Sequence, residues 1–152
     1  MADRISKQLR DAAATALGSP AITSGGLTVT PYKSRYHPVD EKKLATQAPA
    51  FVSTDEERAD QENKHRPFIN RTFLALHIDV VVAKSADVED VLDEFVKLIQ
   101  HRIASTTFAM VKWVAYRGRS ITPDEENQDI LHAEIRFEAF YMAAENAVDV
   151  PL

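Results

Sequence analysis

Apolar and polar side chains alternate over residues 69–83. Every even position from Leu74 to Val82 is aliphatic, whereas the odd positions include polar side chains such as His77 and Asp79. A period of two is the repeat of a strand that buries one face and turns the other towards polar surroundings. The pattern therefore predicts one long strand over this whole segment.

The spacing of apolar residues changes directly after this strand. From residue 87 onwards they lie three or four positions apart, which places them on one side of a helix. Asp87 stands where a capping residue is expected. The pattern predicts a helix over residues 87–103, and its buried side is formed by Val88, Val91, Leu92, Phe95, Leu98, Ile99 and Ile103.

Weaker patterns predict the remaining elements. A helix is expected over residues 3–17, where apolar side chains recur at helical spacing between a cap at Asp3 and a stop signal at Gly18. The segments expected to be loops are residues 34–47, with at most one turn, and residues 117–128. Four further segments are expected as strands, namely residues 27–33, 49–53, 109–116 and 129–142.

The order α-β-β-β-α-β-β is typical of an α+β domain. We expect a single domain over residues 1–152, with an antiparallel-rich mixed sheet of four to five strands and both helices packed on one face. The last strand carries polar side chains at alternate positions, so the other face of the sheet is expected to be wet or to meet a polar partner. Residues 54–67 are expected as a charged loop and residues 144–152 as a flexible tail.

Composition narrows the class of protein. The chain has 152 residues, of which 45% are hydrophobic, so it is large enough for one core. It contains no cysteine, which excludes disulfides and thiolate chemistry and favours the cytoplasm as the place of folding. Its net charge of −5 argues against nucleic acid as a direct ligand. No apolar run is long enough to predict a membrane span, and the N-terminus does not resemble a secretory signal.

The residues that usually carry catalysis or bind metals form no motif here. The five histidines never recur at the spacing that places two metal ligands on one helix. The acidic groups Asp55/Glu56 and Asp124/Glu125/Glu126 fall in segments expected to be solvated loops, where carboxylates keep their ordinary pKa values. We therefore expect no enzymatic activity, no metal and no cofactor.

Two charged segments are candidates for contacts between subunits. The run from residue 54 to 67 begins with acids and ends with bases, and two interpretations stay open: a mobile loop, or an arm or hairpin extension that pairs with a neighbouring copy. A second segment, residues 117–129, has arginines at its start and acids after them. Such segments suit contacts within a ring, where the acidic patch of one subunit meets the basic patch of the next. The candidate interface residues are Asp55, Glu56, Glu57, Lys64, Arg66, Arg71, Arg117 and Arg119.

The order of the segments also resembles a known family. An N-terminal helix, "PAFVSTDEE", the strand "RTFLALHIDVVVA", the helix "DVEDVLDEFVKLIQHRI" and the closing pair "VKWVAYRGRSI" and "ILHAEIRFEAFYM" are similar to the tail terminators, or minor tail protein U-like proteins, of long-tailed bacteriophages. The resemblance covers most of residues 40–143. It lies in hydrophobic pattern and order, without invariant chemical residues.

The resemblance implies a structural virion protein that forms a hexameric ring on the head-proximal end of the tail tube. Such a ring stops tube growth and provides a surface for head joining, so the implied partners are other copies of the chain, the tail tube protein and a neck or head-completion protein. Two alternatives stay open. One is another neck or head-tail joining protein, and the other is a small-molecule-binding or enzymatic domain with a cleft that includes His77, Asp79 or His132.

Overall fold

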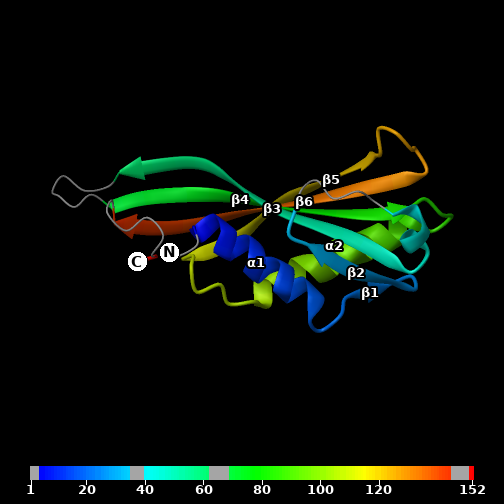
Figure 1. Ribbon diagram of the computed structural model, residues 1–152, viewed down its shortest axis with the longest axis horizontal. Coiled ribbons are helices and arrows are strands. Elements are labelled where there is room, and N and C mark those ends of the chain that lie inside the picture. The colour runs from blue at the N-terminus through cyan, green and yellow to red at the C-terminus, as the bar shows by residue number, and fades with distance from the viewer. Residues whose placement is uncertain (1–3, 35–39, 62–68, 145–150) are drawn as a thin grey trace.

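Six strands form one sheet, and two helices cover one of its faces (Figure 1). The computed structural model describes residues 4–34, 40–61, 69–144 and 151–152. The helices are α1 (Ile5–Gly18) and α2 (Val88–Ser105), and the short 3-10 helix η1 (Glu41–Ala45) precedes the third strand. The strands are β1 (Thr23–Ser24), β2 (Leu27–Tyr32), β3 (Gln47–Gln61), β4 (Ile69–Ala83), β5 (Trp113–Pro123) and β6 (Ile130–Ala144).

The strand order across the sheet is β1-β2-β3-β4-β6-β5. Among the described strands, β2 and β3 pair in parallel and all other neighbours are antiparallel. The expected α+β class with two helices and a mixed sheet is confirmed. The expected count of four to five strands is wrong because β1 adds a two-residue strand, which also changes the expected order. Gly25 and Gly26, both with positive φ, form the tight turn between β1 and β2.

Strand β4 has the bounds that the alternating pattern predicts, Ile69–Ala83. It pairs along its whole length with β6 and from Asn70 to Val80 with β3. The aliphatic side chains at its even positions, from Leu74 to Val82, are at most 2% exposed and pack with the helices in the main core. The predicted register of this strand is therefore confirmed.

Helix α2 contributes the largest fully buried side chain of the core, Phe95, which is 0% exposed. The other residues predicted for the apolar side of this helix are also buried, except Leu98, which is only partly buried. The expected side-chain cap is wrong: Asp87 occupies the N-cap position, but its side chain makes no capping hydrogen bond. Its Oδ1 accepts instead from the hydroxyl of Ser85, at 2.9 Å.

Helix α1 is tied to α2 at its C-terminal end. The guanidinium of Arg102 donates to the carbonyl oxygens of Ala16, at 2.7 Å, and Pro20, at 2.6 Å. The last turn of α1 contains no basic residue of its own, so α2 supplies the positive charge that a helix C-terminus favours. The predicted helix over residues 3–17 is close to the observed bounds, and Asp3, its predicted cap, lies outside the described residues.

Two strands continue further than their hydrophobic patterns indicate. β3 extends to Gln61, so residues 54–61 of the expected charged loop belong to a strand, and the rest of that loop lies outside the described residues. β5 begins at Trp113 and ends at Pro123, so the arginines expected in a loop lie in a strand. Both extensions are stabilised by backbone pairing with an already ordered neighbour, which does not require apolar side chains.

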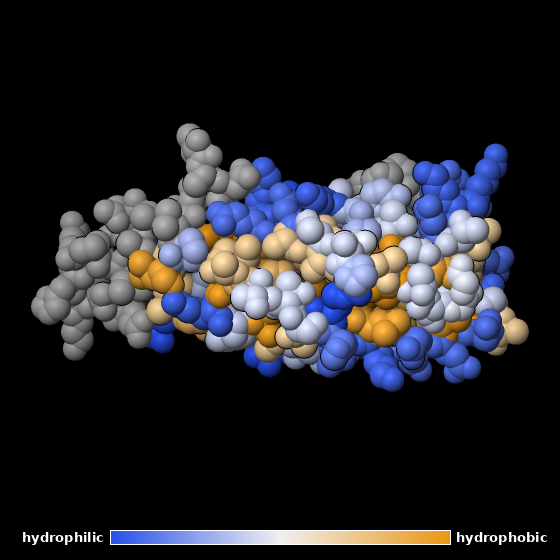
Figure 2. Space-filling view, turned by 90° about the horizontal axis from the view of Figure 1, so that it is seen from below, coloured by the Kyte–Doolittle hydropathy of each residue, from blue (hydrophilic) through white to orange (hydrophobic). Residues whose placement is uncertain are grey.

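A backbone hydrogen bond joins the last strand to residue 152. β6 ends at Ala144, two residues later than expected, and most of the expected tail lies outside the described residues. The N–H of Leu152 donates to the carbonyl oxygen of Met142, at 2.9 Å. Seen from the helical side, the surface mixes hydrophilic residues with separated apolar areas (Figure 2). Of the helices within the described ranges, neither α1 nor α2 is sufficiently long and apolar to cross a membrane.

Replacing Phe95 tests the assignment of the core. Phe95→Ala removes a side chain that is 0% exposed between the helices and the sheet, and we expect it to lower the free energy of unfolding by about 3–5 kcal/mol through lost burial and a residual cavity. Urea unfolding followed by circular dichroism measures this difference. A loss below about 1 kcal/mol would contradict the placement of this helix face in the core.

Candidate functional site

The face of the sheet that the helices leave uncovered, here called the open face, carries most of the unusual chemistry. Three regions follow one another along it. An aromatic cluster lies at one end, charged side chains occupy the middle, and a small apolar cluster of Leu44, Phe51, Val81 and Ile130 lies at the other end, where η1 contributes Leu44. The expectation that the second face is polar is thus correct only for its middle.

The aromatic cluster is formed by Phe73, Trp113 and Phe140 on the adjacent strands β4, β5 and β6. The ring of Phe140 lies 5.1 Å from that of Phe73 and 5.8 Å from that of Trp113. The guanidinium of Arg117 lies 5.9 Å from the centre of the Trp113 ring, within the range of a cation–π contact. Trp113 nevertheless remains 38% exposed, so the cluster is a partly uncovered apolar area at the edge of the sheet.

In the middle of the open face, His77 links three strands. Its Nδ1 lies 3.0 Å from Oε1 of Glu134 on β6, and its Nε2 lies 3.6 Å from Oδ2 of Asp55 on β3. The sequence separates His77 from Glu134 by 57 residues. Each ring nitrogen of His77 thus faces a carboxylate on a neighbouring strand.

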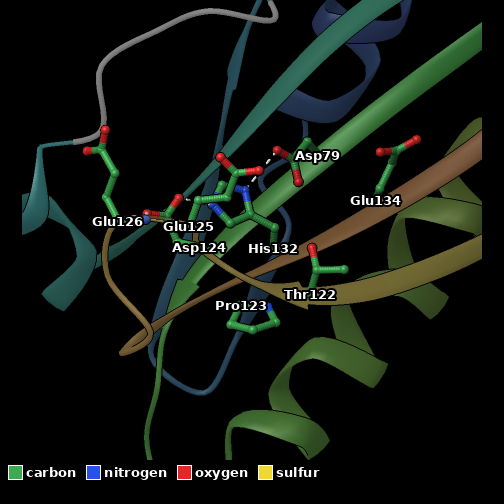
Figure 3. A pocket seen from close by; sticks show the side chains of 8 residues that line it. All are labelled: Asp79, Thr122, Pro123, Asp124, Glu125, Glu126, His132 and Glu134. Carbon is green, nitrogen blue, oxygen red and sulfur yellow. Dashed lines mark hydrogen bonds and ion pairs between the residues drawn. The ribbon is translucent and has the colours of Figure 1, made fainter.

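His132 makes a second arrangement of this kind, closer to the β5–β6 loop (Figure 3). Its Nδ1 lies 2.9 Å from Oδ2 of Asp79 on β4, and its Nε2 lies 2.7 Å from Oδ1 of Asp124 in the loop. The second oxygen of Asp124 accepts from the backbone N–H groups of Glu126 and Asn127, both at 3.1 Å. One carboxylate thus orders the loop internally and connects it to β6.

These contacts change two pKa values. The hydrogen bond to Asp79, with smaller contributions from Asp124, raises the pKa of His132 to about 9 in spite of its partial burial. The hydrogen bond from His132, supported by the two backbone N–H groups, lowers the pKa of Asp124. The expectation that the acids of this loop keep ordinary pKa values is therefore wrong for Asp124, because the loop folds back and places its carboxylate against the imidazole of His132.

Two adjoining hollows follow the charged middle of the open face, and both are lined by Asp79 and Glu134. Together they present six carboxylates and two imidazoles, so the surface is negative even when both imidazoles are protonated, and it favours positively charged groups of a partner. Within the described ranges, no three His, Asp or Glu side chains are arranged to hold a metal ion. The remaining lining residues that ionise are Asp55, His77, Asp124, Glu125, Glu126 and His132.

The structure separates the predicted interface residues from one another. Asp55 lies on the open face next to His77. Glu56 lines another hollow, beside the first residues of α1, and Asp55 lies at the border of both hollows. Arg71 lies on β4 opposite Met142 of β6. The side chain of Glu57 is not described, and Lys64 and Arg66 lie outside the described residues, so the predicted contacts of these three residues remain predictions.

The two arginines of β5 also point in different directions. Arg117 pairs with Glu138 of β6, at 3.0 Å, and lies over Trp113 on the open face. Arg119 pairs with Asp93 of α2 and so belongs to the helical side. Gly118, with a φ of 135°, lies at the irregularity in the pairing with β6 that separates them. These two candidate interface residues therefore lie on different faces of the sheet.

His77, Asp79 and His132, expected only as an alternative cleft, do lie on one face of the sheet. Their partners Asp124 and Glu134 are not among the residues predicted for that cleft. The available signal for Glu134 was its place in the same alternating pattern as His132, two residues away. Nothing local indicated Asp124, because its contact depends on how the β5–β6 loop folds back.

Neither a protein-family model nor a curated protein matches this chain. Any function must therefore be argued from the fold and from the side chains of the open face.

The aromatic cluster can be tested with the single tryptophan of the chain as a reporter. Phe140→Leu removes the ring between Phe73 and Trp113, and we expect a loss of about 1–2 kcal/mol in the free energy of unfolding from lost aromatic contact and burial. The emission of Trp113 should shift to longer wavelength because its ring gains contact with water. An unchanged emission spectrum would contradict the stacked arrangement.

Proposed function

We propose that this chain is a structural tail terminator of a long-tailed bacteriophage, acting in the virion at the head-proximal end of the tail tube. In this role, copies of the chain assemble into a ring. The tail tube protein binds one side of the ring, and a neck or head-completion protein binds the other. The chain carries out no chemical reaction in this proposal. The resemblance in the order of its segments is the starting point.

The observation that carries the proposal is the shape of the β3–β4 hairpin. Strands β3, β4 and β6 have 15 residues each, which corresponds to about 50 Å of extended chain. Helix α2 has 18 residues, about 27 Å. The sheet therefore continues beyond the helical layer, as Figure 1 shows at the left-hand ends of β3 and β4.

This extension favours an arm over a loop as the interpretation of the charged run. Residues 58–61 of β3 pair in register with residues 70–73 of β4, after an irregularity at Glu56/Arg58. A paired strand has an ordered backbone, so it can contact a neighbouring copy at a lower cost in conformational entropy than an unstructured loop. A ring repeats such a contact at every interface.

Native mass measurement tests the ring directly. We expect a particle close to six times the 17.0 kDa mass of the chain, and we expect high salt to loosen it because exposed charges are screened. Added to polymerising tail tube protein, the chain should limit tube length. A chain that stays monomeric with tube protein present would contradict the proposal, whereas a ring that binds only head-side proteins would favour another neck protein.

Charge-matched variants test which face forms the contacts. Arg117→Gln removes a positive charge from the open face, and Lys97→Gln removes one from the exposed outer side of α2. We expect Arg117→Gln to weaken ring formation about tenfold, the effect of about 1.4 kcal/mol, while Lys97→Gln leaves it unchanged. Sedimentation velocity at several salt concentrations measures both. If both variants formed the ring equally well, Arg117 would not take part in the contact between subunits.

A further inference from the structure

The β5–β6 loop, residues 124–129, is attached to the rest of the molecule by side-chain contacts and by backbone hydrogen bonds at its base. Its first residue, Asp124, contacts His132 at 2.7 Å. Asn127 donates to Oε1 of Glu41 in η1, at the longer distance of 3.3 Å. Backbone hydrogen bonds join Lys84 to Asp129 and Asp124 to Ile130 at the base of the loop. The tip at Glu125 and Glu126 therefore depends on Asp124 for its position.

The contact between Asp124 and His132 also depends on Asp79. Asp79 faces the other ring nitrogen of His132, and its second oxygen, Oδ1, is buried with no hydrogen-bond partner among the described residues. A neutral imidazole has one N–H and one lone pair, so it would turn a lone pair towards one of these two carboxylates. Only the protonated ring donates to both, and Figure 3 shows it lying between them.

We propose that the β5–β6 loop is held on the open face by an electrostatic latch, in which protonated His132 joins Asp79 of β4 to Asp124 of the loop, and that loss of either the imidazolium or the Asp124 charge releases the loop. The latch controls how the acidic tip, Glu125 and Glu126, is presented to a partner. The latch is formed within a single chain, so the proposal does not depend on the proposed role in a phage tail.

The direction of the pH dependence follows from the two shifted groups. The pKa of His132 is raised to about 9, so its contribution is complete below the ordinary value of 6.5 and is lost as the pH rises through about 9. The pKa of Asp124 is lowered from 3.8, so its contribution is complete above 3.8 and is lost as the pH falls through the lowered value. The latch is therefore closed between these limits.

Other ionisable groups face the same surface and must be distinguished from His132. They belong to β3, β4, β6 and the loop itself. His77 is the important one, since it contacts Glu134, which lines the same hollow as His132. The variant His77→Gln removes its titration and leaves the latch residues in place. The remaining groups that line the two hollows are Asp55, Glu125, Glu126 and Glu134. One further ionisable group, Glu41 of η1, contacts the loop at Asn127.

The first measurement is a titration of the complete chain by carbon-detected nuclear magnetic resonance, which does not depend on amide protons at high pH. We expect the ring carbons of His132 to titrate near pH 9 and the loop carbonyl signals from Glu125 to Asp129 to change with the same midpoint. The His77→Gln variant should keep this midpoint. A midpoint near 6.5 for His132, or loop signals that do not follow it, would overturn the latch.

The second measurement is limited proteolysis with a glutamate-specific protease at pH 8, followed by mass spectrometry of the bonds after Glu125 and Glu126. His132→Gln should speed cleavage there by about tenfold, because cleavage follows the population of the released loop. Asp124→Asn, in the exposed loop, should act in the same direction without disturbing the sheet. His101→Gln is the matched control, since His101 is exposed on α2.

Far-ultraviolet circular dichroism shows whether each variant keeps the fold of the unmodified chain. If His132→Gln unfolds, Asp124→Asn alone tests the latch. If Asp124→Asn left the loop as resistant as it is in the His101→Gln control, the loop would be held by its backbone and by Glu41 alone, and the proposal would be wrong.

Discussion

The pairing of β4 with both of its neighbours is the constraint on which the rest of the structure depends. β4 pairs with β6 over all of its residues and with β3 over most of them. A slip of one residue would exchange the two faces of the strand, moving its buried aliphatic side chains onto the open face and His77 and Asp79 into the core. Both histidine contacts, His77 with Glu134 and His132 with Asp79, join β4 to β6. The polar contacts therefore specify the same register as the apolar ones.

The elements that could be predicted from the sequence are those whose periodicity is carried by apolar side chains. The bounds of β4, the buried side of α2 and the two-helix α+β class follow from such patterns. The ends of β3 and β5 do not, because their charged residues are held in strands by a neighbour's backbone. The contact between His132 and Asp124 could not be predicted either. It depends on how the β5–β6 loop folds back onto β6, and neither residue lies in a recognisable motif. The division of Arg117 and Arg119 between the two faces could not be predicted from the sequence either, because it depends on the irregularity in the strand pairing at Gly118.

The two faces of the sheet serve different physical purposes. The helical side excludes water from a continuous core that includes Leu76, Ile78 and Phe95. The open face instead keeps ionised groups in contact with solvent and holds them by neighbouring charges of opposite sign. This division lets the negative surface be rigid without being buried, because the strands beneath it are fixed by the other side. A partner would meet a preorganised set of charges, which lowers the entropy lost on binding.

The place of β6 in the sequence has a consequence for the order of folding. β3 and β4 are consecutive strands and can form a hairpin early, whereas α2 and β5 lie between β4 and β6, and contacts such as that of His77 with Glu134 span 57 residues. Until β6 is synthesised and docks, one edge of the most apolar strand stays unpaired. Such an edge is a template for pairing with other chains. The incomplete chain is therefore more prone to aggregate than the complete one, and β6 acts as the segment that closes the sheet against misassembly.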